Sequence, residues 1–481
     1  MSVTRPWFWR SLRLENRTAS EVFAALFVDE DIATLLESPS VADSEYPQLS
    51  RYSICAGSPR KINGKPLLWT PKTGKILPFL RSLLQQSRED NPEVDHLPFT
   101  GGWLGWLGYD LAWEIESLPY LNQDSLPFPV AYWYEPESFA VLDHLQQVLW
   151  LATTEPDRLD NLQTKVDSFP SSPVPQYLRL NTCGEQNHLC LSSPPISNKS
   201  RITFLTNCQQ YQTAVKQAKE YIQAGDIFQT NLSLRFQTKT NRDSWSIYRQ
   251  LQQINPSPFA SYWRSPWGDV VSCSPERLVK LTGTKAETRP IAGTRKRGQN
   301  EQSDRALAKE LLANTKERAE HIMLVDLERN DLGRVCQWGS VEVDELLTIE
   351  RYSHVMHLVS NVKGILQSDC NAIDLIRGVF PGGTITGCPK VRCMEIIEEL
   401  EPVRRSLFYG SCGYLDSRGN LDLNILIRTL LYVPSNNSQF AHVYGQVGAG
   451  IVADSDPQQE WYESLNKAEA QIAALQLTTI D

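Results

Sequence analysis

The sequence predicts an α+β protein, because segments with helical and with strand periodicity follow one another along the chain. Apolar residues in 211–222 repeat at helical spacing, and Gly225 predicts the end of that helix. Residues 227–236 alternate between two kinds of side chain, which is the period of a β-strand. Residues 411–433 predict a hairpin whose turn lies at 416–420, where Asp, Ser, Gly and Asn cluster.

The predicted strand at 227–236 has two faces of different chemistry. One face is mostly apolar and consists of Phe228, Thr230, Leu232, Leu234 and Phe236. The other face is more polar and consists of Ile227, Gln229, Asn231, Ser233 and Arg235. Such a face usually lies in solvent, but its glutamine and asparagine equally suit a polar cavity, so both interpretations stay open.

Further helices are predicted in the second half of the chain. Residues 304–335 form one long helix or two successive helices, with apolar positions at Leu307, Leu311, Ile322 and Val325. Near the C-terminus, Ser455 or Asp456 caps a helix that starts at Pro457.

Composition narrows the class of protein. The chain has 481 residues, of which 41% are hydrophobic and 21% charged, an ordinary globular composition. Its net charge of −9 and the lack of a long basic run exclude nucleic acid and anionic membrane as expected partners.

The ten cysteines form no Cys-x-x-Cys pair, so we expect neither a zinc site nor a disulfide framework. With no signal-like or membrane-length apolar stretch, we expect a cytoplasmic protein.

The length favours about three domains, although a large α+β core reduces that number. Residues 169–200 are rich in proline and serine, which predicts a linker or long surface loop. This divides the chain into an N-terminal region at 1–168 and a C-terminal region at 201–481, where the strongest motifs lie.

A glycine-rich loop at 380–390 opens a predicted helix, with Pro389 at its first position and an apolar stripe at Val391, Met394 and Ile397. Backbone N–H groups at such a turn suit a carboxylate or phosphate. A nucleotide P-loop is excluded, because Cys388 stands where the lysine is required. The plain alternative is a connector between a strand and a helix.

Two Glu-x-x-Glu pairs, Glu317/Glu320 and Glu460/Glu463, lie on predicted helices. A spacing of three places both carboxylates of a pair on one helix face. Charged, solvent-facing helices often show this pattern by chance. If the two pairs face each other, however, they form an oxygen-lined site suited to Mg²⁺.

A further candidate is Glu276, which follows a proline at the end of the strand-like segment 269–273. It is either a general acid or a turn carboxylate in solvent. The segment 410–414 is similar to a nucleophile elbow at Cys412, but Tyr414 replaces the final glycine, so we interpret Cys412 as a buried strand residue.

Taken together, the motifs in the C-terminal region resemble those of the chorismate-utilising enzymes, most of all component I of aminodeoxychorismate synthase and of anthranilate synthase. These motifs are, in order, RPIAGTR, AEHIMLVDLERNDLGRV, HLVS, FPGGTITGCPKVRCMEIIEELEP, IRTL and VGAGIVADSDP. The resemblance is dense over 203–475 and weaker before it, through Leu-Leu-Glu-Ser at 35–38 and Arg-Tyr-Ser at 51–53. Those two short pieces resemble the tryptophan-sensing region of anthranilate synthase.

The resemblance implies stacked antiparallel β-sheets flanked by helices, an active site in the C-terminal half and Mg²⁺-dependent chemistry on chorismate. It implies that Glu320 and Glu463 bind the metal with Glu317 and Glu460 around them, and that Glu276 protonates the departing C4 hydroxyl. The implied lining of the chorismate pocket is Thr294, His357, Thr384, Tyr409, Arg428, Gly448, Gly450 and Lys467. Of these, Arg428 and Lys467 suit the two substrate carboxylates.

The resemblance also bears on the nucleophile. Relatives that add water have a lysine base where this chain has Gln229, so ammonia is the expected nucleophile, delivered by a separate glutaminase subunit. The PGGTITG loop resembles aminodeoxychorismate synthase and favours 4-amino-4-deoxychorismate as product. Ala292, in PIAGT, instead matches the anthranilate synthase form and replaces a lysine found in many aminodeoxychorismate synthases. The alternatives are therefore anthranilate synthase component I and, from another class, a non-catalytic regulatory protein on this fold.

Overall fold

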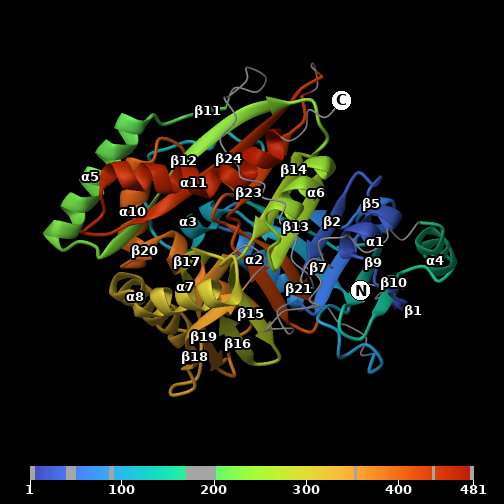
Figure 1. The fold of residues 1–481 in the computed structure, drawn as a ribbon. Helices are drawn as coiled ribbons and strands as arrows, with labels where there is room; N and C mark the ends of the chain where they lie inside the picture. Colours follow the sequence, from blue (N-terminus) through green and yellow to red (C-terminus); the bar gives the residue numbers. More distant parts are fainter. Residues whose placement is uncertain are drawn as a thin grey trace.

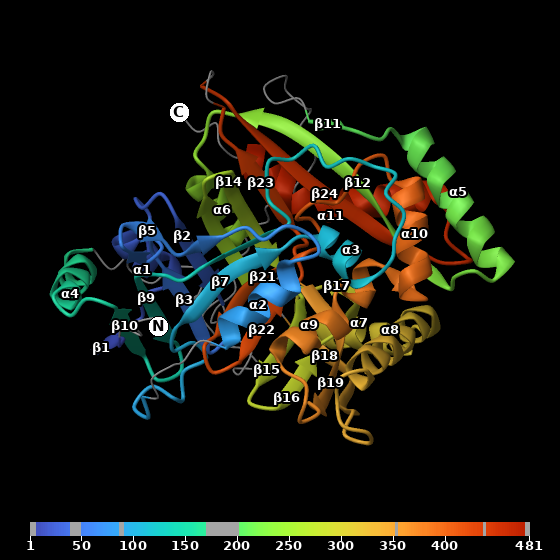
Figure 2. The same ribbon diagram turned by 180° about the vertical axis from the view of Figure 1, so that it is seen from behind.

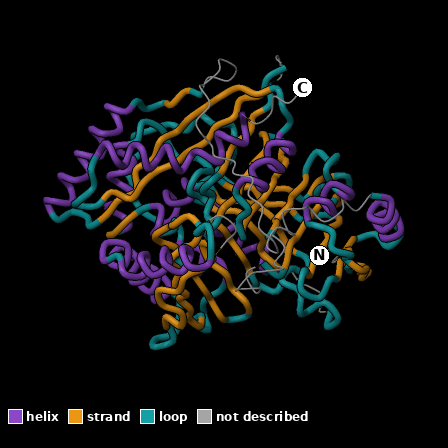
Figure 3. Tube along the Cα trace, viewed as in Figure 1, coloured by secondary structure: helices purple, strands orange, loops and turns teal. Residues whose placement is uncertain are grey.

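A computed structural model (Figure 1) describes residues 6–38, 50–85, 91–169, 202–351, 355–435 and 439–476. Two large β-sheets dominate it, and every strand pair in the described residues of these sheets is antiparallel. Helices lie on the outside, as the tube in Figure 3 shows. The predicted α+β fold of stacked antiparallel sheets flanked by helices is confirmed.

The first sheet has twelve strands and joins the two halves of the chain. Its strands, in spatial order, are β1 (Phe8–Arg13), β10 (Val148–Thr153), β9 (Ser138–Asp143), β3 (Tyr52–Ala56), β2 (Ala33–Glu37), β13 (Phe259–Ser265), β14 (Gly268–Ser274), β23 (Thr429–Val433), β24 (Ala441–Ile451), β12 (Gln229–Thr240) and β11 (Thr203–Phe204), with β20 (Gly387–Cys388) also paired to β12.

The second sheet has ten strands and again mixes early and late segments. Its strands are β17 (Ile291–Lys296), β19 (Val355–Ile365), β16 (Lys285–Thr288), β15 (Arg277–Thr282), β22 (Leu421–Asn424), β21 (Ser411–Asp416), β7 (Gly102–Leu107), β8 (Ala131–Tyr134) and β6 (Leu68–Trp69), with β18 (Glu342–Arg351) paired to β19. A separate small hairpin consists of β4 (Lys61–Ile62) and β5 (Lys65–Pro66).

The described helices are α1 (Ala19–Leu26), α2 (Ile76–Leu84), α3 (Ala112–Ile115), α4 (Arg158–Ser168), α5 (Cys208–Ala224), α6 (Ser244–Ile254), α7 (Glu301–Ala313), α8 (Thr315–Gly333), α9 (Ala372–Val379), α10 (Lys390–Leu400) and α11 (Pro457–Gln476). Helices α5, α6 and α11 pack on the β12–β24–β14 part of the first sheet, while α7 and α8 pack on β17 to β19 (Figures 1 and 2). None of the described helices is long and apolar enough to cross a membrane.

The core has two main parts, which follow from the alternation of side chains in the strands. One lies between the sheets and includes Trp106 and Trp133 from the second sheet and Trp263 from the first. The other lies between the first sheet and its helices and includes Leu232 of β12 and Val215 of α5. Each face of the first sheet is therefore buried, which explains why its strands are rich in apolar residues.

Most predicted elements are found. Helix α5 ends at Gly225, whose φ of 83° places it in the left-handed region that glycine tolerates. Two successive helices, α7 and α8, meet at Asn314, whose side chain caps α8. The Asp456 carboxylate accepts hydrogen bonds from the backbone of Gln458 and Gln459 at the start of α11.

Four expectations need correction. The hairpin 411–433 turns where predicted, but its second strand ends at Asn424, and β23 crosses to the first sheet because Arg428 breaks the strand with φ of 52°. Pro389 is the extended cap of α10 rather than its first helical residue. Phe228 is 69% exposed and Ile322 is 44% exposed, so neither belongs to the core face assigned to it.

The region of 169–200 beyond Phe169 lies outside the described residues. The strands before it and those after it share both sheets. In particular, β2 from the N-terminal region pairs with β13 from the C-terminal region.

Candidate active site

The predicted site residues come from both sheets and from two helices that flank them. Strands β12 and β24 pair in register, so Asn231 lies opposite Gly450 and Ser233 lies opposite Gly448. A side chain on Gly450 would reach within 2.5 Å of Gln229 Nε2 and 3.7 Å of Glu320 Oε1. Glycine at 448 and 450 therefore allows neighbouring groups to approach β24 closely, since a Cβ atom at either position would collide with them.

The two Glu-x-x-Glu pairs lie on α8 and α11 and influence each other electrostatically. Burial raises the pKa of Glu320, and the negative charges of Glu317 and Glu463 raise it further. Lys467 opposes this effect from α11, where its Nζ lies 2.8 Å from Glu463 and donates a hydrogen bond to the Gly448 carbonyl at 3.1 Å. Glu320 of one pair and Glu463 of the other therefore interact electrostatically between α8 and α11, and a shared metal site stays a prediction.

Glu460 is the fourth glutamate of the two pairs and lies three residues before Glu463 on α11. It is buried, and burial raises its pKa, with the Glu463 charge adding to the effect and Lys467 and Lys316 lowering it. One of its carboxylate oxygens has no hydrogen-bond partner in the described residues. Glu317 is held differently, because Arg295 of β17 forms an ion pair with it at 3.2 Å.

The described residues hold no cluster of three or more acidic, histidine or cysteine side chains close enough to bind a metal ion by themselves. Mg²⁺ does not need such a cage, because it binds proteins through one or two carboxylates and takes its other ligands from substrate and water. The donor chemistry of Glu320 and Glu463 fits that mode, with one carboxylate on each helix.

Glu276 lies between β14 and β15 and is only 6% exposed, so the alternative of a turn carboxylate in solvent is wrong. Burial raises its pKa to about 7, and the neighbouring Thr384 hydroxyl lowers it slightly. The backbone fixes the residue firmly, since its N–H donates to Ser274 Oγ and its carbonyl accepts from the Ile425 N–H. A carboxylic acid that keeps its proton near neutral pH suits a general acid.

A second buried carboxyl group, Glu328 of α8, was not predicted. It is 7% exposed, and burial together with the charge of Asp331 raises its pKa to about 8, with Glu276 adding to the effect. Asp331 forms a buried ion pair with Lys390 at 2.5 Å. Its sequence context, Asp-Leu-Glu-Arg-Asn-Asp, resembles a charged run that faces solvent. The only signal for the burial of Glu328 was its position in the helical repeat of α8.

Arg428 and Tyr409 are both held in left-handed backbone conformations, with φ of 52° and 64°. Such conformations are unfavourable for residues with side chains and are concentrated at functional sites. The Arg428 guanidinium donates to the Lys467 carbonyl, and burial lowers its pKa. No carboxylate of the described residues forms an ion pair with it, and a guanidinium matches the geometry of a carboxylate, so its binding to a substrate carboxylate stays a prediction.

His357 of β19 and Thr294 of β17 face each other across paired strands, with Nδ1 and Oγ1 3.0 Å apart. Burial lowers the pKa of His357 to about 4, and the positive charge of Arg428 adds to this. The imidazole is therefore neutral at pH 7 and can exchange hydrogen bonds without carrying charge. Ala292 lies two residues before Thr294, is 9% exposed and pairs with Leu358.

The polar face of β12 is buried, so the interpretation that it lies in solvent is wrong, while its role in a polar cavity stays a prediction. Gln229 is 3% exposed, Asn231 is 9% exposed and Ser233 is 6% exposed. The side-chain oxygens of Gln229 and Asn231 have no hydrogen-bond partner among the described residues. Cys412 is likewise a buried strand residue, as predicted, and burial raises the pKa of its thiol to about 11.

The glycine-rich loop 380–390 contributes to this site through the residues that it positions. It carries Thr384 to the Glu276 carboxyl group, and its β20 segment pairs with Gln229 and Thr230 of β12. Its only lysine, Lys390, is already engaged with Asp331. Binding of a ligand anion to the loop backbone stays a prediction.

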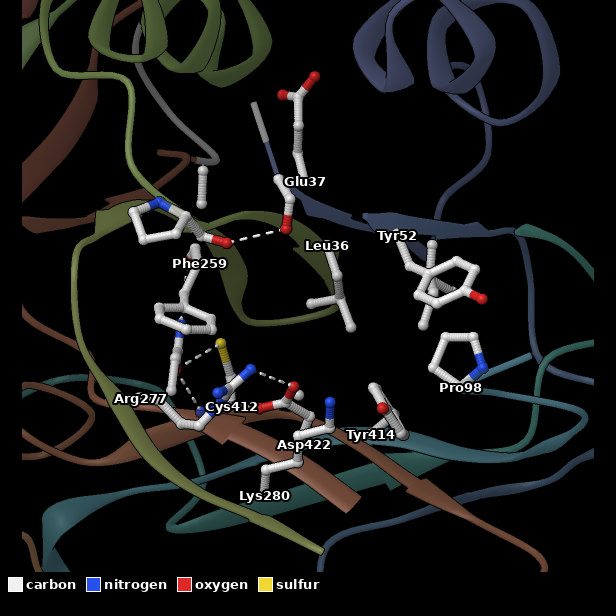
Figure 4. Close-up of a pocket in the computed structure, with 16 residues that line it drawn as sticks. Leu36, Glu37, Tyr52, Pro98, Phe259, Arg277, Lys280, Cys412, Tyr414 and Asp422 are labelled. Carbon is white, nitrogen blue, oxygen red and sulfur yellow. Dashed lines mark hydrogen bonds and ion pairs between the residues drawn. The ribbon is translucent and has the colours of Figure 1, made fainter. Parts of the chain in front are cut away.

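A separate cavity of about 90 Å³ lies between the sheets near the N-terminal strands (Figure 4). Arg277 and Asp422 line it and form an ion pair at 2.8 Å, and Arg277 lies over the ring of Phe259. Leu36, Glu37, Ser38 and Tyr52 line it as well. The two pieces that resemble a tryptophan-sensing region, 35–38 and 51–53, therefore meet at one cavity.

Comparison with known proteins agrees with this geometry. A family model for chorismate binding enzymes matches residues 38–473. The chain is 62% identical over 480 residues to the anthranilate synthase component I-like protein of Synechocystis sp., covering 98% of this chain and 92% of the relative. It is 42% identical over 440 residues to aminodeoxychorismate synthase component 1 of Bacillus subtilis, covering 89% and 90%.

A solved structure, that of anthranilate synthase component I from Streptococcus pneumoniae, superposes with a TM-score of 0.69 at 32% identity. The alignment covers 88% of this chain and 92% of that one. A family match over most of the chain, several relatives above 30% identity and a shared fold agree with one another. The chain belongs to the family of chorismate binding enzymes.

Proposed function

We propose that the protein replaces the C4 hydroxyl group of chorismate with nitrogen from ammonia and forms 4-amino-4-deoxychorismate. The observation that carries this proposal is the buried Glu276, a carboxylic acid with a pKa of about 7. Position 229, where a base would be needed to activate water, is occupied by a glutamine. The site can protonate a leaving hydroxyl group, but the Gln229 amide cannot activate water by removing its proton.

The chemistry balances with these groups. The C4–O bond breaks with its electron pair leaving on oxygen, and the Glu276 proton converts that oxygen into water. The lone pair of ammonia forms the new C–N bond, and the resulting ammonium group then releases a proton. Chorismate and ammonia thus give the amino product and water, with no oxidation or reduction.

Chorismate is a dianion, so its binding requires positive groups in a protein whose net charge is −9. Arg428 and Lys467 supply them, and His357 with Thr294 adds uncharged hydrogen-bonding groups. We propose Glu320 and Glu463 as the residues that hold Mg²⁺. When bound, the ion stabilises negative charge on the ring carboxylate.

We infer that a separate glutaminase subunit supplies the ammonia, because the sequence contains no Gly-x-Cys-x-Gly motif. The purified chain is expected to turn over chorismate with ammonium and Mg²⁺ but not with glutamine. Consumption of glutamine by the chain alone, at the rate seen with ammonium, would contradict this inference.

Anthranilate synthase component I is the second candidate, and two observations favour it. The chain is 62% identical to a relative named anthranilate synthase component I-like, and the cavity near Arg277 gathers both pieces that resemble a tryptophan-sensing region. The mass spectrum of the product from chorismate and ammonium separates the candidates. Anthranilate with pyruvate as the main product means that the second candidate is correct.

The non-catalytic alternative predicts chorismate binding without turnover. The burial of Glu276 and the approach of both glutamate pairs argue against it, since a binding protein has no need of a protonated acid beside its ligand. Mg²⁺-dependent consumption of chorismate with ammonium excludes this alternative in one assay.

A further inference from the structure

Arg405 lies between α10 and β21 and is only 1% exposed. Its Nε and Nη2 atoms donate to the two carboxylate oxygens of Glu401, at 2.9 and 2.7 Å. Nη1 donates to the Ile385 carbonyl at 2.7 Å, and Nη2 also donates to the Asn231 carbonyl at 2.7 Å. These hydrogen bonds occupy four of the five N–H donors of a guanidinium, so this buried cation is not available to bind a substrate carboxylate.

The two carbonyls that Arg405 bridges belong to segments that carry predicted site residues. One is the carbonyl of the residue that follows Thr384, whose hydroxyl lies beside the Glu276 carboxyl group. The other is the carbonyl of Asn231 in β12, and the N–H of Asn231 donates to the Thr386 carbonyl of the glycine-rich loop at 2.9 Å. Arg405 therefore fastens the glycine-rich loop to β12 at the point where the two segments meet.

The guanidinium of Arg405 also packs against Tyr409. Its central carbon lies 4.6 Å from the centre of the Tyr409 ring and 4.8 Å from the centre of the Tyr109 ring. A cation over the face of an aromatic ring is attracted by the electrons of that face, so both rings are held against the guanidinium. The Tyr409 hydroxyl is buried and has no hydrogen-bond partner among the described residues. The ring thus takes its orientation from its packing, and the contact with Arg405 is part of that packing.

Glu401 anchors this arrangement at the end of α10. Its Oε1 accepts from the N–H and the hydroxyl of Ser233, at 2.8 and 2.6 Å, in addition to Arg405. Glu401 is 5% exposed, so its ion pair with Arg405 is buried on both sides. Replacing a buried ion pair by apolar residues often costs no stability, and the best-attested use of such pairs is to specify one arrangement of the chain. The pair therefore indicates a role in geometry.

We propose that Arg405 is a positioning residue of the active site, which fixes the glycine-rich loop and the Tyr409 ring relative to β12 without touching the substrate itself. This role rests on the proposed function, because it concerns the arrangement in which chorismate is bound and turned over. Arginine suits it, since the planar fork donates in several fixed directions and stacks on rings, whereas a lysine ammonium is a point charge on a flexible chain.

Arg405→Lys separates positioning from a purely structural role. Lysine keeps the positive charge beside Glu401 but cannot reproduce the planar fork that bridges both carbonyls. Turnover of chorismate with ammonium and Mg²⁺ is expected to fall about a hundredfold, the order of effect that a misplacement of about 1 Å produces. Thermal melting is expected to show Arg405→Lys as folded and more stable than Arg405→Met, which loses the ion pair as well. Lysine thus restores stability but not turnover.

Arg404→Met is the matched control. Arg404 is 5% exposed, lies over the rings of Trp113 and Tyr120 at 3.8 and 4.1 Å, and forms an ion pair with Asp110 at 3.5 Å. None of its hydrogen bonds, ion pairs or ring contacts in the described residues reaches the glycine-rich loop or Tyr409. Its melting temperature is expected to fall, whereas turnover measured below the melt is expected to stay within about threefold of wild type.

Glu401→Gln acts on Arg405 from the other partner and keeps the test open if Arg405→Lys fails to fold. The glutamine keeps an acceptor for Ser233 but removes the charge that orients the guanidinium. Turnover is expected to fall about tenfold, in the same direction as in Arg405→Lys, because Arg405 is held less firmly.

Two results would overturn the positioning role. Turnover near wild type in Arg405→Lys would show that the charge alone is enough. A loss of turnover in Arg404→Met as large as that in Arg405→Lys would show that any loss of a buried arginine in this segment has the same effect.

Failure of the proposed function gives a different pattern. If the wild-type chain consumes no chorismate, that function is overturned, and the positioning role is then tested by the affinity for chorismate in isothermal titration calorimetry. Arg405→Lys is expected to weaken this affinity about tenfold, and Arg404→Met less than about threefold. If the wild-type chain does not bind chorismate either, the function and the positioning role are overturned together.

Discussion

The candidate active site and the cavity near Arg277 are both polar, yet their groups are satisfied in opposite ways. In the cavity, Arg277 and Asp422 share two hydrogen bonds, and Glu37 accepts from Ser20 and Tyr248. In the active site, the side-chain oxygens of Gln229 and Asn231 have no hydrogen-bond partner in the described part of the chain. Polar groups that satisfy one another stabilise the fold, whereas groups kept unpaired are available to reactants.

This contrast leads to opposite expectations for substitutions in the two regions. Changes in the active site should abolish turnover with little effect on folding, and changes at the cavity should weaken folding with little effect on turnover.

The largest effect is expected at the glutamates that face each other from α8 and α11. Glu320→Gln or Glu463→Gln removes one charge of the proposed Mg²⁺ site but little volume, so turnover of chorismate should fall roughly a thousandfold or more. Steady-state rates at saturating Mg²⁺, together with thermal melts, measure both quantities. Rates near wild type in both variants would refute the metal assignment.

Glu276→Gln should lower turnover about a hundredfold or more, because it removes the proposed proton donor. In the wild type, activity needs the protonated form and should fall as pH rises through about 7, the raised pKa of Glu276. Glu328→Gln is the matched control and should keep this fall at the same pH, since glutamine preserves a neutral side chain beside Glu276. A wild-type rate that is flat from pH 6 to pH 9 would contradict the role of general acid.

Substitutions at Ala292 test whether this position acts by volume. Ala292→Leu fills space beside Thr294 and should raise the KM for chorismate about tenfold or more, while Ala292→Gly should change it less than about threefold. No adduct of the protein with the ring should form, since the position has no lysine. A protein mass increased by that of the ring would show that another nucleophile attacks.

The smallest effect on activity is expected at the cavity. Arg277→Met keeps an aliphatic contact with Phe259 but leaves Asp422 unpaired, so the free energy of unfolding should fall by about 2 kcal/mol. Turnover with ammonium should change less than about threefold. Lys280→Met in the same cavity is the control, because no ion pair is lost there. A large loss of turnover at unchanged stability would mean that the two regions are coupled.

The parts of the site that depend on local spacing could be predicted from the sequence. Three-residue spacing puts both carboxylates of a pair on one helix face, and period two puts Gln229, Asn231 and Ser233 on one strand face. What these faces meet depends on tertiary packing. Glu328 illustrates this, because its charged neighbours favour solvent while α8 packs that side of the helix against Glu276.

Other differences have the same origin. Nothing in the local sequence of 411–433 shows that the chain leaves one sheet at Asn424 and enters another at Thr429. The left-handed backbone of Arg428 makes that crossing possible, and the same residue then faces the site. The cavity near Arg277 likewise combines residues from β2, β3, β13, β15 and β22, which no spacing argument brings together.

The position of α11 along the chain has a consequence for biosynthesis. This helix carries Glu460, Glu463 and Lys467, and its backbone carbonyl at Lys467 holds Arg428. It is synthesised after every other described element that lines the site. A nascent chain can therefore pair its early strands while it still lacks two of the four glutamates in the Glu-x-x-Glu pairs and Lys467, one of the two cations proposed to bind the substrate. Competence for catalysis is acquired last, so shortened translation products should fold in part yet never consume chorismate.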